Sequence, residues 1–234
     1  MKKAITLSAA TLALLVAGAS GASAVSAASV NDGHWTSKGT IGFTPNSKAQ
    51  NITNPEVPEL THPGGSAGTL AIDYVPELDF GKPQISSKTE TYYAKANINA
   101  FKGTAVGAFV EMHDLRGLGT GNNTQLTVTQ IKGFNNDKGD LAKADLSFSA
   151  GQAANAGGGD YTPTAPRSFT LTPNTAQLVM STNGISGQFL TSYGKASDYT
   201  ENETGGPISL SVPSGSALAV DFSTTLEWDL EIAP

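Results

Sequence analysis

The sequence predicts an all-β protein: a single antiparallel domain of the sandwich or barrel-like type, preceded by an extended N-terminal lead-in. From residue 69 onward, apolar residues come in short alternating runs that are separated by turn-forming residues. No stretch of the chain shows a sustained helical period. The last run is the clearest, because apolar residues occupy every even position but one from Leu218 to Ile232, while the odd positions are small, polar or acidic. A two-residue period of this kind is typical of a half-buried strand.

The first 27 residues have the pattern of a secretory signal peptide. Two lysines precede an apolar run at 4–19, and the small-x-small pattern of a cleavage site occurs at 22–24 and again at 25–27. A retained membrane anchor is the alternative, but a span needs about 20 apolar residues, and this run is shorter and contains Ser, Thr and Gly. We place cleavage between Ala24 and Ala28. We therefore expect an extracellular mature chain with no transmembrane segment after signal removal.

Residues 28–66 form the predicted lead-in, which is rich in Pro and Asn and contains one short expected strand, the apolar TIGF segment at 40–43. The predicted domain covers 67–234. Within the domain we expect strands at 69–75, 91–98, 105–113, 124–131, 144–149, 167–172, 176–181, 187–192, 207–212 and 217–232.

The expected last strand runs almost to Pro234, the final residue of the sequence. We therefore expect no C-terminal transmembrane stretch and no sorting tail. Any attachment to a surface would then be made by the folded domain itself.

Composition indicates an exported protein that depends on apolar burial for its stability. Cysteine is absent, so no disulfide contributes, and a secreted chain without cysteine fits a bacterial exterior. The 20 acidic and 14 basic residues give a formal charge of −6. Removal of the signal peptide takes away two of those 14 lysines and arginines and no acid, which leaves 12 against 20, a charge of −8. Such a surface repels polyanions, which disfavours nucleic acid, anionic lipid and phosphate-rich wall polymers as partners.

No pattern in the sequence supports catalysis or metal binding. The Gly-Gly-Ser-Ala-Gly string at 64–68 matches a serine hydrolase motif, but that motif needs a buried strand before it and a helix after it. His34, His62 and His113 are not spaced with one another or with a carboxylate as metal ligands would be. A wall-active hydrolase would need convergent carboxylates or a metal, and no such pair is recognisable. We therefore predict a protein that is not an enzyme, with no catalytic residue, no metal and no cofactor.

Three segments carry a resemblance to a known family: LAIDYVPELDFG at 70–81 with KPQIS after it, VEMHDLRG at 110–117, and TTLEWDLEIAP at 224–234. Together they resemble the WxL domain of Gram-positive surface proteins, and the resemblance extends back to about residue 35. It implies non-covalent association with the peptidoglycan-containing cell wall. It also implies partner surface proteins of the same gene cluster, including membrane-anchored ones.

The sequence departs from the family pattern at one of its two Trp-x-Leu elements. The terminal element is present as Trp228-Asp229-Leu230, but the central position reads Thr124-Gln125-Leu126. A wall-binding surface formed jointly by two tryptophans is therefore not implied for this chain.

Candidate binding residues come from two of the matching segments, of which the terminal one is specific. They are Trp228, Asp229, Leu230 and Pro234 in the terminal segment, and Asp114 and Arg116 in the VEMHDLRG segment.

Each of these groups also has a structural interpretation. Trp228 and Leu230 share the strand face that is more often buried, so they can be core residues. A carbohydrate platform would instead need an exposed aromatic ring, and a partly covered ring at the domain rim would satisfy both interpretations. Asp114 and Arg116 can fix a glycine turn through a local ion pair or can face a ligand.

Two hypotheses for attachment follow. In the first, the domain binds peptidoglycan or another cell-wall component directly. In the second, it is a protein-interaction subunit whose last strand pairs with a strand of a wall-anchored or membrane-anchored partner. Exposed aromatics beside polar loops would favour glycan, whereas an exposed apolar patch or an unpaired strand edge would favour protein.

Overall fold

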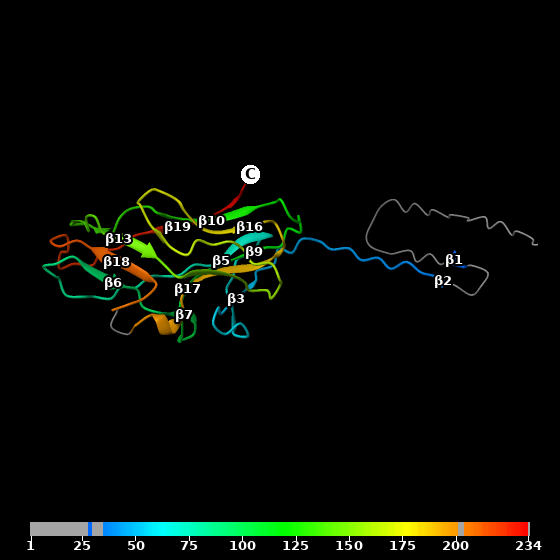
Figure 1. Cartoon of the computed structure of the whole chain (residues 1–234), viewed down its shortest axis with the longest axis horizontal. Coiled ribbons are helices and arrows are strands. Elements are labelled where there is room, and N and C mark those ends of the chain that lie inside the picture. The colour runs from blue at the N-terminus through cyan, green and yellow to red at the C-terminus, as the bar shows by residue number, and fades with distance from the viewer. Residues whose placement is uncertain (1–27, 30–34, 201–203, 234) are drawn as a thin grey trace, which may run out of the picture. The chain divides into compact units, whose positions relative to one another are not determined.

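The computed structural model describes residues 28–29, 35–200 and 204–233, and the chain divides into two units, Met1–Phe43 and Thr44–Pro234 (Figure 1). The predicted signal peptide and Pro234 lie outside the described residues. In the first unit, β1 (Ala28–Ser29) pairs antiparallel with β2 (Trp35–Thr36). The short strand expected at 40–43 is wrong. Ile41 and Phe43 are 81% and 88% exposed, and the described part of this unit offers no strand with which the segment pairs.

The second unit confirms the all-β prediction. Its one described helical turn is the 3-10 helix η1 (Ala196–Asp198). Its strands are β3 (Asn51–Thr53), β4 (Thr61–Pro63), β5 (Leu70–Tyr74), β6 (Glu90–Tyr93), β7 (Asn97–Phe101), β8 (Thr104–Val106), β9 (Ala108–Asp114), β10 (Thr124–Gln130), β11 (Asn135–Asn136), β12 (Gly139–Asp140), β13 (Asp145–Phe148), β14 (Gly151–Asn155), β15 (Phe169–Thr170), β16 (Gln177–Thr182), β17 (Gly187–Tyr193), β18 (Ile208–Val212) and β19 (Leu226–Ile232).

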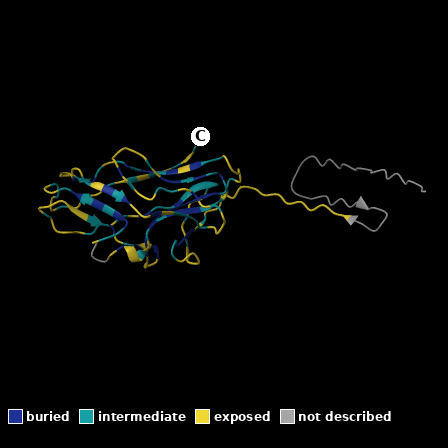
Figure 2. Cartoon of the chain, in the orientation of Figure 1, coloured by how far each residue is buried: buried dark blue, intermediate teal, exposed yellow. Residues whose placement is uncertain are grey.

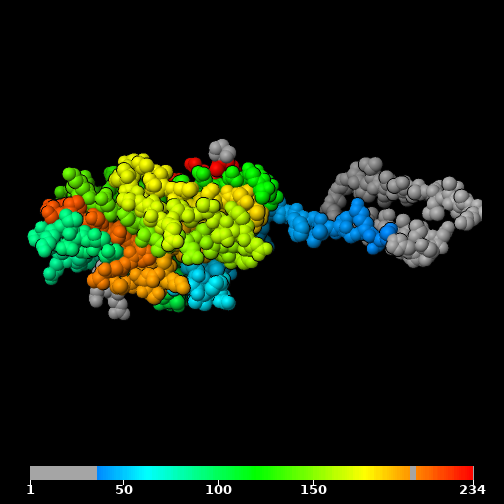
Figure 3. Space-filling model, viewed as in Figure 1, coloured from blue at the N-terminus to red at the C-terminus, as the bar shows by residue number. Residues whose placement is uncertain are grey.

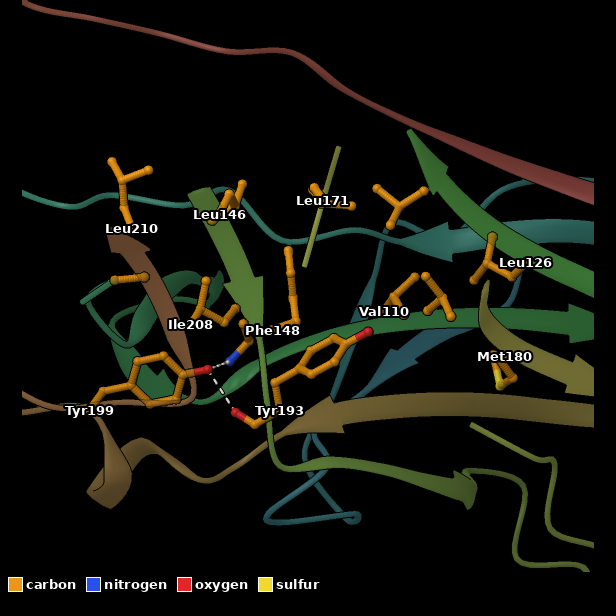
Figure 4. Packing of buried hydrophobic residues seen from close by; sticks show 14 of the residues in the cluster. Val110, Leu126, Leu146, Phe148, Leu171, Met180, Tyr193, Tyr199, Ile208 and Leu210 are labelled. Carbon is orange, nitrogen blue, oxygen red and sulfur yellow. Dashed lines mark hydrogen bonds between the residues drawn. The ribbon is translucent and has the colours of Figure 1, made fainter. Parts of the chain in front are cut away.

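Three antiparallel sheets build this unit around a shared core. Their strand orders are β14-β17-β9-β5, β15-β13-β18-β6 and β16-β10-β19, and the pairs β3-β4, β7-β8 and β11-β12 form small two-stranded additions. No closed barrel forms among the described strands. Inward side chains of the three sheets meet in one apolar cluster, in which Val110 and Tyr193 lie close to Phe148 and Ile208 (Figure 4). Buried residues are concentrated in these strands, and exposed ones in the loops (Figure 2).

Strand β9 is buried along its whole length because both of its faces are covered. Val110 and Met112 contribute to the main cluster. On the opposite face, Phe109 packs in a second cluster with residues of β3, β7, β8 and β17. The second unit begins at Thr44, so part of the stretch that the sequence assigns to the lead-in belongs to the folded unit, and its Ile52 packs in this second cluster.

A buried tyrosine fixes the turn after β17. The Tyr199 hydroxyl donates to the Tyr193 carbonyl at 2.7 Å and accepts from the Ala108 N–H at 3.0 Å (Figure 4). Burial therefore raises the pKa of Tyr199 well above its ordinary value of 10.0.

Three expected strands are divided or irregular in the structure. The 105–113 strand is interrupted at Gly107, between β8 and β9. The 91–98 strand is divided into β6 and β7, because the Ala94 N–H makes the last bond to β18, to the Ile208 carbonyl, and the next N–H, that of Lys95, donates to the Asp79 carbonyl. Of the 217–232 strand only β19 is regular, and 217–225 contains a single bridge, between Ser223 and Asn135. The apolar alternation of the sequence continues through 217–225 because, from residue 220 onward, the side chains are alternately half-buried and exposed. The backbone of this stretch is not part of a strand, because the ladder between β10 and β19 ends at Leu226.

Candidate binding groove at the edge strand

Strand β19 lies at the edge of its sheet, with β10 on one side and no described strand on the other. The register places Val128 opposite Trp228, Leu126 opposite Leu230 and Thr124 opposite Ile232. The sequence TQL at 124–126, which stands where the family has its central Trp-x-Leu, is therefore the direct neighbour of the terminal motif. Thr124 is fully buried and its hydroxyl bonds that of Thr182 at 2.6 Å, so a buried hydrogen bond occupies this position.

The hydrogen-bond pattern shows which backbone groups of β19 are unpaired. In an antiparallel pair, hydrogen-bonded and non-hydrogen-bonded positions alternate. The Ile131 N–H donates to the Thr225 carbonyl and the Ala233 N–H to the Asn123 carbonyl, both at 3.0 Å, so the odd residues of β19 bond to β10. The N–H and C=O groups of the even residues therefore point away from β10. Within the described chain, these groups of Leu226, Trp228, Leu230 and Ile232 have no hydrogen-bond partner.

Trp228 is half-buried and lies at the margin of the core. Its ring packs against the main apolar cluster and also lines a groove of about 1100 Å³. Leu226, which precedes Trp228 on the same face of β19, also packs against the cluster and lines the groove. Leu230 packs against the cluster but does not line the groove. The structure thus places Trp228 at the domain rim. We call this hollow the Trp228 groove; its apolar lining includes Leu78, Phe80, Tyr92, Val212, Phe222 and Trp228.

Two irregular segments form the walls of the Trp228 groove. One is 75–85, which follows β5, and the other is 217–225, which precedes β19. Figure 3 shows the stretch near 75–95 beside the stretch near 210–222 at one end of the second unit. An ion pair of 3.0 Å between Lys82 and Asp221 links the walls, but both side chains are largely exposed, so it contributes little to stability. The floor is apolar because Tyr92, Leu210 and Val212 of the paired strands β6 and β18 line it.

The solvent face of β19 is acidic. Glu227, Asp229 and Glu231 are exposed, and Asp229, one of the predicted binding residues, lies in the middle of this row. Their cross-strand neighbours on β10 are neutral: Thr129, Thr127 and Gln125. No ion pair involves the three acids in the part of the chain that the structure describes.

Asp114 and Arg116 form a buried ion pair outside the Trp228 groove. Two parallel hydrogen bonds join them: Arg116 Nε to Asp114 Oδ1 at 3.0 Å and Arg116 Nη2 to Asp114 Oδ2 at 2.7 Å. The carboxylate raises the pKa of the Arg116 guanidinium, although burial acts against this. Nη2 also donates to the Asn122 carbonyl, next to the residue that bonds Ala233 at the end of the last strand. The pair fixes the glycine turn, and a binding role for either residue stays a prediction, as it does for Pro234.

A buried polar cluster on β5 and β9 could not be found from the sequence. His113 Nδ1 lies 2.8 Å from Asp73 Oδ2, and His113 Nε2 lies 2.7 Å from the Gly68 carbonyl oxygen. Burial alone would lower the pKa of His113, but these two acceptors outweigh it and raise the pKa. Glu111 Oε2 accepts from the Thr53 N–H at 2.9 Å, while Oε1 is buried without a partner.

This cluster serves the fold. Burial raises the pKa of Glu111 to about 8. Side chains of Asp73, Glu111 and His113 hold backbone groups of the 53–68 stretch, and no part of the Trp228 groove reaches them. Alternation of Glu111 and His113 along one strand is visible in the sequence, but Asp73 lies 40 residues away.

Among the described residues, no group of three or more His, Asp or Glu side chains is arranged to hold a metal ion. The same residues include no helix long and apolar enough to cross a membrane.

A family model, the WxL domain, described as surface cell wall-binding, matches residues 30–234, nearly the whole chain. No curated protein and no solved structure matches significantly.

Proposed function

Because the chain belongs to the WxL domain family of surface cell wall-binding proteins, we propose that it is a secreted, non-catalytic module of a Gram-positive cell surface, held at the wall without a covalent bond. The Trp228 groove and the free edge of β19 are its contact surface. The family match supports a location at the cell surface and a role in wall binding. The contact surface itself is argued from the geometry of β19.

One observation carries this assignment. Trp228 belongs to the motif for which the family is named, yet it is not sealed within the core: it lines an apolar groove on an edge strand. A tryptophan needed for packing alone would gain most from full burial. A large groove with an apolar floor and polar side chains such as Gln84 and Thr225 on its walls is a common form of binding site.

Two routes connect this surface to the wall. In the first, peptidoglycan contacts the aromatic side chains of the groove directly, with Trp228 and Tyr92 as the rings available for stacking. In the second, a partner surface protein occupies the groove and is itself attached to the wall or the membrane. The unpaired edge of β19 favours the second route, because an exposed strand edge is a template for pairing with a strand of another protein.

Sedimentation with isolated walls separates the two routes. The mature chain, residues 28–234, is mixed with Gram-positive walls stripped of protein and, in parallel, with unstripped walls, and the bound fraction is measured. Binding only to unstripped walls is the result expected for a partner protein. Saturable binding to stripped walls would establish direct attachment to peptidoglycan or another wall polymer. Absence of binding to either wall would contradict the proposed function.

A further inference from the structure

The free edge of β19 presents a regular row of backbone groups. Leu226, Trp228, Leu230 and Ile232 each direct one N–H and one C=O away from β10. These groups are spaced as the ladder of a further strand requires. A strand edge of this length is a template for another extended chain.

Side chains on the two faces of β19 define what an added strand would carry. Residues of neighbouring strands that lie opposite each other share a face of the sheet. On the groove face the added strand would meet Leu226 and Trp228, which favours apolar side chains at alternate positions. On the solvent face it would meet Glu227, Asp229 and Glu231, which have no cationic neighbour on β10 and favour Lys or Arg.

The same acids argue against a second copy of β19 as the occupant. Pairing two β19 edges would bring Glu227, Asp229 and Glu231 of one copy beside the same residues of the other. Like charges on adjacent strands are destabilising. Charged residues on an edge strand are also a usual way to prevent unwanted pairing. The three acids therefore disfavour pairing between two β19 edges and favour a strand that carries Lys or Arg.

We propose that the occupant of this surface is an extended strand of a partner protein, in which apolar residues alternate with Lys or Arg. It pairs with the free edge of β19, places its apolar side chains over the Trp228 groove and its cations beside the three acids. This inference rests on the partner route of the proposed function and specifies the partner's chemistry.

Amide exchange with synthetic peptides tests the pairing directly. The probe is a ten-residue peptide in which Val and Lys alternate, and two controls are a peptide with Glu in place of Lys and a scrambled peptide of the same composition. In the free protein, the amides of Trp228, Leu230 and Ile232 are expected to exchange quickly and those of Asp229 and Glu231 slowly, as measured by NMR. The Val/Lys peptide should slow the exchange of the even residues. Binding that leaves them unprotected, or equal binding of either control peptide, would overturn the proposal.

A proline substitution distinguishes the contribution of a backbone N–H on the edge of β19 from that of the side chain at the same position. In Ile232→Pro the missing N–H is one that points outward, so no bond to β10 is lost, and the original side chain is 66% exposed. The matched variant Ile232→Thr removes the same side chain and keeps the N–H. We expect the proline variant to bind the Val/Lys peptide about fivefold more weakly than the threonine variant. Equal affinities would contradict a hydrogen-bonded edge.

Charge reversal tests the solvent face. Substitution of Glu227, Asp229 and Glu231 by Lys should weaken binding of the Val/Lys peptide by roughly tenfold or more and permit binding of the Glu-containing peptide. Unchanged preference would show that the acids do not select the partner. These peptide measurements are independent of the wall assay. Stripped walls that bind fully would refute the partner route, whereas a failed peptide test alongside binding only to unstripped walls would refute strand pairing alone.

Discussion

Replacement of Glu111 by Gln should change how stability depends on pH. Glu111 is fully buried on β9, and one of its oxygens accepts from the Thr53 N–H while the other has no partner. Burial raises its pKa from 4.5 to about 8, so the folded protein holds this carboxyl protonated at neutral pH. Glutamine keeps an acceptor for Thr53 and does not titrate.

The sign and size of the effect follow from the two pKa values. Between pH 4.5 and about 8 the folded state binds a proton that the unfolded state has released, so stability falls as pH rises. The slope approaches about 1.4 kcal/mol per pH unit, which gives a loss of up to about 4 kcal/mol between pH 5 and pH 8. The pKa of His113 is also raised, so the stability that His113 contributes is likewise lost as pH rises above its ordinary pKa of 6.5. This contribution is the same in the wild type and in Glu111→Gln.

Urea denaturation at pH 5, 6, 7 and 8 measures this difference. The Glu111→Gln variant should be close to the wild type at pH 5 and clearly more stable at pH 8. His113→Asn is the comparison that removes the other titrating group of the cluster. If wild type and Glu111→Gln lose stability in parallel as pH rises, Glu111 is not titrating in this range and the assignment of a protonated carboxyl fails.

Three further substitutions test the packing of Trp228, the ion pair of Arg116 and the close backbone approach at Gly107. Trp228→Ala should lower the free energy of unfolding by about 1–3 kcal/mol, which is less than for a fully buried tryptophan. It should also reduce the fraction bound to unstripped walls. Trp228→Phe should retain most of the stability and most of the wall binding. Arg116→Ala leaves the buried Asp114 carboxylate without its ion pair and should cost about 2–4 kcal/mol in urea denaturation, and a change below about 0.5 kcal/mol would show that the pair does not hold the turn. In Gly107→Ala the new Cβ would lie 2.6 Å from a backbone carbonyl oxygen, so thermal denaturation should show a clear loss, whereas Gly133→Ala, with nothing within 4 Å, should melt like the wild type.

Local pattern was enough to predict most of the longer strands, but it missed β14, which pairs with β17 along its whole length. The alternation of β10 and of Leu226 to Ile232 is regular because one face of each is covered. The same alternation misled at 217–225, since half-burial against a groove produces the same period as half-burial in a sheet. Periodicity reports which side chains are covered and does not report whether the backbone has a partner.

The candidate site was only partly visible in the sequence. Trp228 stood out through its motif, but the segments that form the walls of the groove lie more than 100 residues apart and show no shared pattern. The edge position of β19 depends on sheet order, which a single sequence does not determine. The Asp73 and His113 pair was missed for the same reason, since its members are joined only by the register of β5 with β9.

Photo-crosslinking from the rim of the Trp228 groove tests the central claim most directly. A benzoylphenylalanine is placed at Leu218, which lines the groove and is 48% exposed, and in a matched protein at Ile98 of β7, which is 56% exposed and lies outside the groove. Each protein is bound to unstripped Gram-positive walls and irradiated. We predict a wall-derived adduct from position 218 and none from position 98. An adduct from position 98 with none from position 218 would contradict attachment through the Trp228 groove.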